Sequence, residues 1–511
     1  LLWASETKAQ VTYNWANKIE SYGDRPVNVV TDASGNVYTL GFAQFGGDFD
    51  PSPTSSYTLT AGTFVQKLDA NGDFVWAKNI EQVPTSPQGV CNPSAICLDG
   101  AGNVLITGWY LGIIDVDPSS SATFTLAGIN TAASTTARNA FVLKLNAATG
   151  NFIWAKGFDG NYGSASSDFF PTGIAVDNAN NVFTTGYVNN NTVDFDPSTS
   201  GTYTVSFSSS VYESYVTKLD ASGNFVWANK YGNNTQHLTN NAIALDAAGN
   251  VYFGGKFGGN VDFDASAATF TLSSTGISDM NVTKLNNAGG FIWSKKIGIA
   301  SQSNYVTALT VDNFGSILLA GYEGTASQKI IKLSPLGNVI WTSSYNFCTI
   351  NAITTDAIGN VYSTGDFNNS NSNFGSTSVL LSPNGLKDVF ISKLDSGGNA
   401  IYALKVGSTS NDIGRGIAVT NSYGVYVTGE FNGTADFNPT AGTYTMANTY
   451  GVSTFVLKLT SPCTASISVN SGTICSGQSF TFTPSGANSY TYSTGSSVFT
   501  PTASGLNYTV T

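Results

Sequence analysis

One stretch of sequence recurs along the chain and limits the possible folds more than any other feature. Its first copy, at 64–78, reads FVQKLDANGDFVWAK. Two apolar runs flank Asn71 and Gly72, and this dipeptide tolerates the positive φ angles of a tight hairpin turn. Further copies lie at 141–156, 215–230 and 281–296, with weaker ones at 329–344 and 390–405. A repeat of this length predicts an array of like units, each containing this β-hairpin.

A second phrase lies upstream of each hairpin. Its first copy, at 27–41, reads VNVVTDASGNVYTLG, and copies follow at 94–108, 172–186, 241–255, 307–321, 351–365 and 415–429. Asp-x-x-Gly-Asn predicts a turn between two short strands. Each complete unit is therefore expected to be four antiparallel strands, which we call a, b, c and d, in an all-β fold.

Counting the marks of each strand predicts how the array closes. The a–b phrase occurs seven times, and a Lys-Leu mark identifies strand c at Lys67, Lys144, Lys218, Lys284, Lys332, Lys393 and Lys458. An aromatic mark of strand d follows only six of these, at Trp76, Trp154, Trp227, Trp293, Trp341 and Tyr402. Trp15 supplies the remaining mark, ahead of the first a–b phrase. We therefore expect a seven-bladed β-propeller over 11–460 whose last blade is completed by the N-terminal strand, because this closure removes an open edge.

These marks also carry a family resemblance. Through GIAVD…GNVY.TG…KLD..GNFVWAK, residues 11–460 resemble the seven-bladed propeller (SBBP-type) repeats of secreted bacterial proteins. The Lys-Leu and tryptophan marks stop after Leu459. Residues 461–511 resemble the Ig-like β-sandwich modules of such proteins, and both a complete and an incomplete module are consistent with this length. The resemblance implies a secreted or cell-surface protein, type IX secretion and contact with the secretion machinery. Residues 1–10 have two interpretations, the remnant of a signal peptide or a frayed N-terminus.

Composition excludes several classes of function. Only 10% of the residues are charged and the net charge is -11, so a nucleic-acid backbone would be repelled. No apolar run is long enough to cross a membrane, so membrane insertion is not expected. The cysteines match no metal or redox spacing, and their disulfide pairing stays open. They are Cys91, Cys97, Cys348, Cys463 and Cys475.

The connections between strands differ on the two faces of the predicted ring. The a–b and c–d turns are tight, whereas the b–c and d–a loops are long and varied. Loops can change without disturbing the blades, so the varied face is the expected binding surface.

The b–c loops carry a phrase of their own, Asp-x-Asp. In an extended segment both carboxylates lie on the same side. One interpretation is a calcium site, since Ca²⁺ binds clustered carboxylate oxygens. The alternative is that these side chains accept local backbone N–H bonds. The candidate ligands are Asp48, Asp50, Asp115, Asp117, Asp194, Asp196, Asp262 and Asp264.

Aromatic residues in the same loops are the candidate ligand-binding residues. Aromatic rings stack on sugars and also form protein hot spots, although they can equally pack their own loops. The candidates are Tyr57, Tyr110, Tyr212, Tyr305 and Tyr450, with Phe169 and Phe170 nearby. The strand-c lysines have two interpretations: a ring of cations that attracts an anionic glycan, or, as favoured here, side chains that each reach a carboxylate or carbonyl in their own or the adjacent blade. The candidate carboxylates are the acids of the a–b turns, and Lys458 should differ because its blade has Thr420 at that place.

Catalysis has little support in the sequence, so no catalytic residue is assigned. His237 is the only histidine, and no nucleophile motif surrounds it. We expect a non-enzymatic recognition or adhesion propeller that binds a glycan or a protein, without a cofactor apart from the calcium interpretation. The alternatives are a structural cargo or stalk domain, or a polysaccharide-active enzyme with carboxylates at the axial pocket. Its candidate acids are Glu213, Glu323, Asp366 and Glu430.

Overall fold

A computed structural model shows an all-β chain, in agreement with the sequence analysis, and no helix occurs among the residues it describes. No described segment therefore forms a helix that could cross a membrane. The described residues are 11–21, 23–82, 89–119, 121–127, 137–158, 160–161, 168–189, 192–208, 210–232, 235–298, 302–324, 327–375, 379–461, 468–469, 480–481, 484–485 and 498–499.

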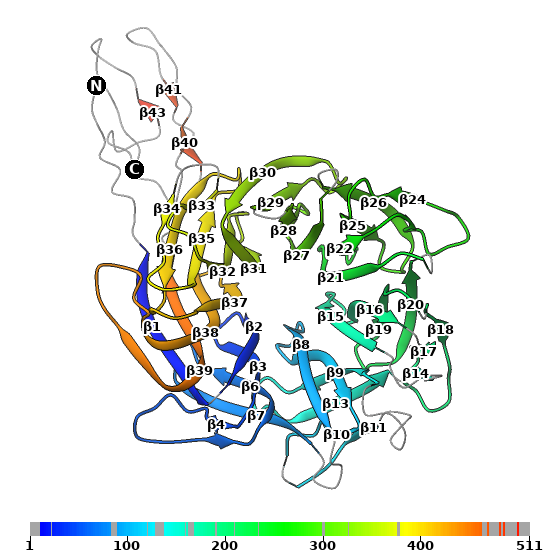
Figure 1. The fold of residues 1–511 in the computed structure, drawn as a ribbon, viewed down its shortest axis with the longest axis horizontal. Helices are drawn as coiled ribbons and strands as arrows, with labels where there is room; N and C mark the ends of the chain where they lie inside the picture. Colours follow the sequence, from blue (N-terminus) through cyan, green and yellow to red (C-terminus); the bar gives the residue numbers. More distant parts are fainter. Residues whose placement is uncertain are drawn as a thin grey trace. The chain divides into compact units, whose positions relative to one another are not determined.

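Six blades, not seven, are each folded from one continuous stretch of chain into four antiparallel strands (Figure 1). The first three consist of β2 (Arg25–Thr31), β3 (Val37–Ala43), β6 (Gly62–Leu68) and β7 (Phe74–Gln82); β8 (Val90–Leu98), β9 (Val104–Leu111), β12 (Asn139–Leu145) and β13 (Phe152–Phe158); and β15 (Asp168–Val176), β16 (Val182–Asn189), β19 (Glu213–Leu219) and β20 (Phe225–Tyr231).

The next three blades follow the same order. They consist of β21 (Leu238–Leu245), β22 (Val251–Phe257), β25 (Asp279–Leu285) and β26 (Phe291–Ile297); β27 (Asn304–Val311), β28 (Ile317–Glu323), β29 (Ser327–Leu333) and β30 (Val339–Asn346); and β31 (Cys348–Thr355), β32 (Val361–Phe367), β35 (Asp388–Leu394) and β36 (Ala400–Val406).

One further sheet, which we call the composite sheet, draws on both ends of the ring. Its order is β37 (Ile413–Val419), β38 (Gly424–Asp436), β39 (Thr445–Thr460) and β1 (Thr12–Ser21). The segment around Trp15 therefore lies hydrogen-bonded beside β39, and the Thr460 hydroxyl bonds the Asn14 side chain at 2.8 Å. The innermost strand β37 contacts β31 on one side and β2 on the other, so the composite sheet closes the ring.

The tight turns that join strands a to b and c to d follow one pattern. In the first blade the Asp32 N–H donates to the Asn36 carbonyl at 3.1 Å, and Asp32 Oδ1 accepts the N–H groups of Ser34 and Asn36. Gly35 has φ 80, in the left-handed region that favours glycine. These turns define what we call the turn face of the propeller, and the b–c and d–a connections define the loop face.

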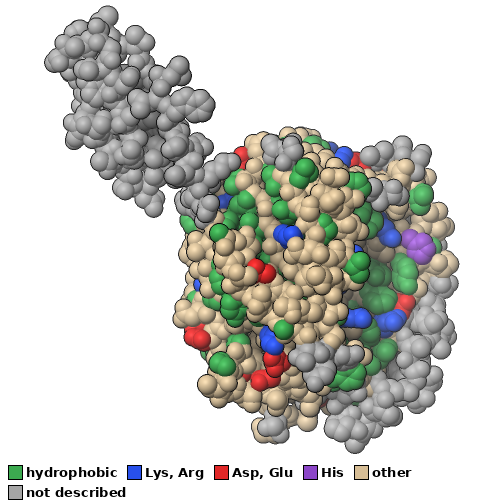
Figure 2. All heavy atoms as spheres, turned by 60° about the vertical axis from the view of Figure 1, so that its left-hand side comes forward, with side chains coloured by type: hydrophobic (Ala, Val, Ile, Leu, Met, Phe, Trp, Pro, Cys, Tyr) green, Lys and Arg blue, Asp and Glu red, His purple; other side chains and the backbone are tan. Residues whose placement is uncertain are grey.

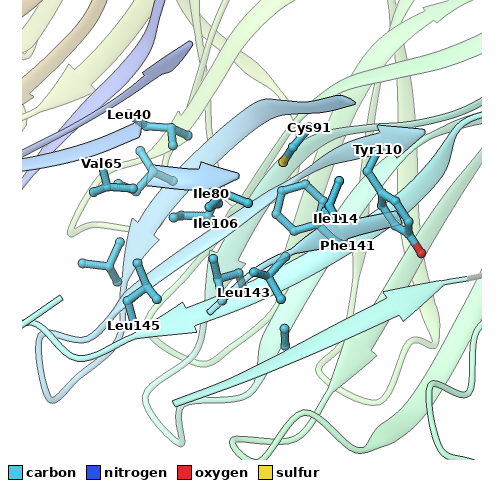
Figure 3. Packing of buried hydrophobic residues seen from close by; sticks show 14 of the residues in the cluster. Leu40, Val65, Ile80, Cys91, Ile106, Tyr110, Ile114, Phe141, Leu143 and Leu145 are labelled. Atoms are coloured by element: carbon cyan, nitrogen blue, oxygen red, sulfur yellow. The ribbon is translucent and has the colours of Figure 1, made fainter. Parts of the chain in front are cut away.

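The hydrophobic core lies between neighbouring blades. Figure 3 shows Leu40, Val65 and Ile80 of the first blade beside Ile106 and Leu143 of the second, all buried in one cluster. Alternate residues of each strand face one neighbour or the other, so every sheet is apolar on both sides. Burying each side chain of this size contributes about 1.5–3 kcal/mol.

Hairpins from the b–c connections extend the outer edge of the preceding sheet. β4 (Gly47–Asp48) pairs with β1, β10 (Ile113–Asp115) pairs with β7, and β33 (Ser372–Phe374) pairs with β30. Their second strands are β5 (Thr58–Leu59), β11 (Thr125–Ala127) and β34 (Leu380–Leu381). Backbone hydrogen bonds thus join these neighbouring blades and cover part of an edge that would otherwise be open.

Other b–c connections form small sheets of their own or none. In the third blade β17 (Thr192–Asp194) pairs with β18 (Thr204–Ser206) and with β14 (Gly160–Asn161), which lies in the preceding d–a connection. In the fourth blade β23 (Asn260–Asp262) pairs with β24 (Thr271–Ser273). In the fifth blade β28 ends at Glu323 and β29 begins at Ser327, so the connection between them is too short to form an additional hairpin.

The chain divides into two compact units, and the propeller occupies Tyr13–Thr460. The other unit includes Ser461–Thr511, of which four short strands are described. They pair as β40 (Ser468–Val469) with β42 (Pro484–Ser485) and as β41 (Phe480–Thr481) with β43 (Val498–Phe499). These pairs do not establish the Ig-like sandwich expected from the sequence. Cys463, Cys475 and the signal-peptide interpretation of 1–10 lie outside the described residues.

Candidate functional site

Each sheet of the ring carries one variable position at the loop face, directly after the glycine that ends its a–b phrase. We call these the rim residues: Phe42, Trp109, Tyr187, Lys256, Tyr322, Asp366 and Glu430. The preceding glycine allows a close approach of strands a and b. At Gly255, for example, an added Cβ would lie 1.7 Å from the Thr239 carbonyl oxygen. The scaffold thus fixes the backbone at this place while the next side chain is free to vary.

A hollow of about 450 Å³ lies on the loop face, and we call it the aromatic basin. Figure 2 shows a hollowed area where hydrophobic and basic side chains gather, with the histidine at its edge. The basin belongs to the third, fourth and fifth blades. Its lining residues are Phe170, Tyr187, Tyr212, Thr239, Asn241, Lys256 and Tyr305.

The aromatic side chains of the basin pack against one another. The rings of Phe170 and Tyr187 lie 5.2 Å apart, and those of Tyr187 and Tyr212 lie 5.2 Å apart in an edge-to-face arrangement. Tyr305 stacks on the rim residue Tyr322 at 4.7 Å. Such contacts hold the rings in fixed orientations. The basin is therefore a preformed aromatic surface.

An ion pair below the rim fixes one side of the basin. The Arg138 guanidinium pairs with Asp168 and lies 4.8 Å from the ring centroids of both Trp109 and Phe170. The Tyr212 hydroxyl donates to the other Asp168 oxygen at 3.1 Å. Burial, and then the nearby Asp168 carboxylate, raise the pKa of Tyr212, so its hydroxyl stays neutral at physiological pH. Both oxygens of Asp168 therefore have partners within the protein, and the carboxylate holds Arg138 and Tyr212 in place at this side of the basin.

Three of the rim residues are charged, and two of them form an ion pair with a residue of opposite charge. Asp366 pairs with Lys387 at 2.9 Å, and Glu430 with Arg415 at 2.9 Å. Lys256 is half-buried, and within the described part of the chain it makes no hydrogen bond or ion pair. The basin therefore holds one cation that the described protein leaves unmatched.

His237 lies in an exposed loop. Its Nδ1 accepts the backbone N–H of Tyr212 at 3.1 Å, and the two rings lie 5.6 Å apart. The histidine therefore positions the loop that carries Tyr212.

The aromatic residues predicted from the sequence fall into different environments. Tyr212 and Tyr305 line the basin. Tyr110 is fully buried against Phe141 in the core, so its predicted place in an open loop was wrong: β9 runs on to Leu111 and turns this side chain inward. Tyr57 is exposed but packs on Phe74 at 5.1 Å, at the outer edge of its sheet. The side chain of Tyr450 lies outside the described residues.

Of the two predicted phenylalanines, only Phe170 lines the basin. Phe169 is fully buried, because adjacent strand residues point to opposite faces.

The Asp-x-Asp residues make the same local contacts in each loop. In the first, Asp48 Oδ1 accepts the N–H groups of Asp50 and Tyr57 at 3.0 and 2.8 Å, and Asp50 Oδ1 accepts that of Ser52 at 2.9 Å. The middle residue, Phe49, is fully buried. Asp115, Asp117, Asp194, Asp196, Asp262 and Asp264 accept equivalent bonds.

These bonds favour the interpretation of Asp-x-Asp as a loop-forming motif over calcium binding. The described residues contain no group of three or more His, Cys, Asp or Glu side chains that could hold a metal ion. Calcium therefore stays a prediction from sequence, without further support.

A second hollow, a polar groove of about 730 Å³, crosses the edge of the composite sheet. Asp48 and Asp50 line it together with Lys18 and Glu20, which pair with each other at 2.5 Å. It lacks the aromatic walls of the basin apart from Tyr444.

The candidate catalytic acids do not meet in one pocket. Glu213 pairs with Lys230 at 2.9 Å and Glu323 pairs with Lys329, each in its own blade. Asp366 and Glu430 have the basic partners given above. Every one of these carboxylates is thus bound to a cation.

On the turn face, lysine and tryptophan make repeated contacts. Ion pairs confirm the expected partners for four lysines: Lys144–Asp99, Lys218–Asp177, Lys284–Asp246 and Lys332–Asp312, at 2.8, 3.9, 3.6 and 2.9 Å. Lys458, whose blade has Thr420 in place of the turn acid, bonds the Ala70 carbonyl at 2.6 Å. Lys67 makes the same kind of bond, to the Ala147 carbonyl at 2.9 Å, and burial lowers the pKa of both lysines.

The strand-d tryptophans link neighbouring sheets at the same face. Trp76 Nε1 donates to the Ala147 carbonyl at 3.2 Å, and Trp15 Nε1 donates to the Ala70 carbonyl at 3.3 Å. Trp154, Trp227, Trp293 and Trp341 do the same to the c–d turn of the next blade.

Three described cysteines, Cys91, Cys97 and Cys348, are free thiols. Burial raises the pKa of Cys91 to about 12, so this thiol is unreactive at physiological pH.

Sequence reasoning missed Tyr187, Lys256, Thr239 and Asn241, because each occupies an ordinary strand position. A usable signal existed: the residue after the glycine of the a–b phrase changes type from blade to blade, whereas the residues before it stay small or apolar.

Comparison with known proteins adds a distant relative. No family model matches the chain. An uncharacterised WD repeat-containing protein, L264 of Acanthamoeba polyphaga mimivirus, is 24% identical over 519 residues, which cover 82% of this chain and 36% of that protein. The chain thus spans little more than a third of its relative's length.

Solved structures with a similar fold are likewise distant. A streptogramin B lyase has a TM-score of 0.42 at 12% identity, covering 87% of this chain and 97% of that one. The virginiamycin B lyase of Staphylococcus aureus has a TM-score of 0.42 at 10% identity, covering 88% and 99%. The chain is a β-propeller. Likeness at this level says nothing of what the propeller binds or acts on.

Proposed function

We propose that this protein is a non-enzymatic recognition propeller that binds carbohydrate in the aromatic basin. The observation that carries the proposal is the preformed set of rings, Phe170, Tyr187, Tyr212 and Tyr305, around one hollow on the loop face. Aromatic faces pack against the C–H groups of sugar rings, and Thr239 and Asn241 add polar groups that can orient hydroxyls. A hollow of about 450 Å³ is of the size that small ligands occupy.

A glycosidase is a weaker alternative. Such an enzyme needs two carboxyl groups across one pocket. Asp168, beside the basin, is held by Arg138 and Tyr212, and the nearby acids Glu213 and Glu323 pair with Lys230 and Lys329. A protein ligand remains the other alternative, and a surface or secreted location is proposed on the sequence resemblance alone.

We also propose that the composite sheet acts as a seventh blade and that 461–511 forms an Ig-like module. Two contacts of β1 support the first part. Trp15 bonds the next sheet as Trp76 does, and Tyr13 packs on Tyr444 at 5.4 Å, as Phe74 packs on Tyr57. A crystal structure of the whole chain would test both parts.

The binding proposal is tested by titrating the full chain calorimetrically with a panel of oligosaccharides. Tyr187→Ala and Tyr305→Ala should each weaken binding about tenfold, since each removes a stacking surface. The matched control is Tyr57→Ala, which removes the same side chain at a site outside the basin. Equal weakening by all three variants, or no binding by any sugar of the panel, would overturn the proposal.

A further inference from the structure

The aromatic basin contains one positive charge, that of Lys256, in addition to its aromatic rings. Lys256 is a rim residue on β22, between the aromatic rim residues Tyr187 of the third blade and Tyr322 of the fifth. Its ammonium group has no hydrogen-bond or ion-pair partner among the described residues. A half-buried ammonium group loses part of its hydration, so an incoming anion would be favoured there.

The other charged groups around the basin are already matched. Asp168 and Arg138 neutralise each other, and the acidic rim residues Asp366 and Glu430 have their own basic partners. His237 uses Nδ1 as an acceptor. The local excess is therefore one positive charge, although the chain as a whole carries -11.

We infer that the ligand is an acidic sugar, in which a carboxylate or sulfate group pairs with Lys256 while the sugar ring stacks on the tyrosines. This inference rests on the proposed function and names the class of carbohydrate. A single ammonium group is a point charge with three rotatable donors, so it accepts either anion. Such a contact is a charge-assisted hydrogen bond and weakens as salt increases.

The test compares an oligogalacturonate, a sulfated galactan oligosaccharide and a neutral cello-oligosaccharide of equal length on the full chain. At least one acidic sugar should bind more tightly than the neutral one. Lys256→Met should reduce that affinity about tenfold or more, and Lys256→Arg should restore most of it. The control is Lys295→Met, which removes a lysine from β26 of the same blade and should leave binding unchanged.

The outcomes separate the inference from the proposed function. If neutral and acidic sugars bind alike and Lys256→Met changes neither affinity, the inference is wrong while carbohydrate recognition stands. If none of the three sugars binds, both are overturned. Comparison of the carboxylated and sulfated probes identifies which anion the site takes.

Discussion

The turn face and the loop face are built from the same repeats, yet they differ in kind. On the turn face, the same contacts repeat around the ring. The strand-d tryptophans donate to the c–d turn of the next blade, and several strand-c lysines pair with the a–b turn acid of their own blade. On the loop face, the corresponding rim position holds Trp109 in one blade, Lys256 in another and Glu430 in a third. Contacts that repeat hold the ring together, and departures from the repeat concentrate where a ligand can bind.

The largest effect is expected from removing the strand that joins the two ends of the ring. Deletion of residues 1–21 takes away β1, including the buried Ala16 and Ile19, and exposes the edge of β39. We expect a loss of about 5 kcal/mol or more and a broadened thermal transition in calorimetry. Deletion of residues 1–10 alone is the control and should leave the propeller transition intact. A full-strength transition after the longer deletion would mean that the ring does not depend on β1.

A pair of tryptophans compares the two faces directly. Trp76→Ala on the turn side should cost about 3–5 kcal/mol in urea denaturation, since this residue is 7% exposed and loses its bond to Ala147. Trp109→Ala at the rim should cost about 1 kcal/mol, because that ring is half-buried. Equal losses would remove the distinction between a structural and a variable face.

One carboxylate on each face has a shifted pKa, and the two shifts have opposite directions. At the loop-face end of β35, burial raises the pKa of Asp388 from 3.8 to about 6. The folded state therefore holds a proton that the unfolded state releases, so stability falls by about 2 kcal/mol as pH rises from about 4 to about 6. Burial also raises the pKa of the neighbouring Asp412, so Asp388→Asn should reduce that slope without abolishing it in denaturation curves measured across this range.

The control for this experiment is Asp99 on the turn face. Burial alone would raise the pKa of Asp99, but hydrogen bonds from Lys144 and Asn103 outweigh it and lower the pKa below 3.8. Its contribution is complete above that pH and is lost only in stronger acid. Asp99→Asn should therefore leave the slope between about pH 4 and pH 6 unchanged. If Asp388→Asn also keeps the slope, Asp388 is not the group responsible.

The smallest effect is expected from removing calcium. Because Asp48 and Asp50 accept backbone N–H bonds, EDTA should shift the melting temperature by no more than about 1 °C. A bound ion present at 100 times its Kd would add about 2.7 kcal/mol, which calorimetry would detect readily. A clear drop in melting temperature with EDTA, reversed by calcium, would restore the metal interpretation.

Much of the scaffold could be predicted because repetition makes its marks countable. No tryptophan follows Lys458, and this absence predicted that Trp15 lies beside the last strand. The recurrence of a strand-c lysine and an a–b turn acid predicted the pairing of Lys144 with Asp99. These features depend on local turns and strand periodicity, which the sequence displays directly.

Only some residues of the basin were predicted from the sequence, because membership of the basin depends on the direction in which each side chain points. Tyr110 and Tyr212 were both predicted to lie in b–c loops, yet Tyr110 enters the core and Tyr212 faces the hollow. Strand β9 continues one residue past Tyr110, and the sequence contains no mark of that extension. Lys256 was missed because its importance arises from neighbours in other blades, which become adjacent only when the ring closes.

The pairing of β1 with β39 has a consequence for biosynthesis. The earliest strand of the propeller to leave the ribosome must wait for its partner until more than four hundred further residues have been made. Throughout that interval both the waiting strand and the growing array present an open edge to other chains. Slow translation or a scarcity of chaperones should therefore lower the yield of folded protein, because strands of different chains pair with each other. This loss would occur even if the completed ring is stable.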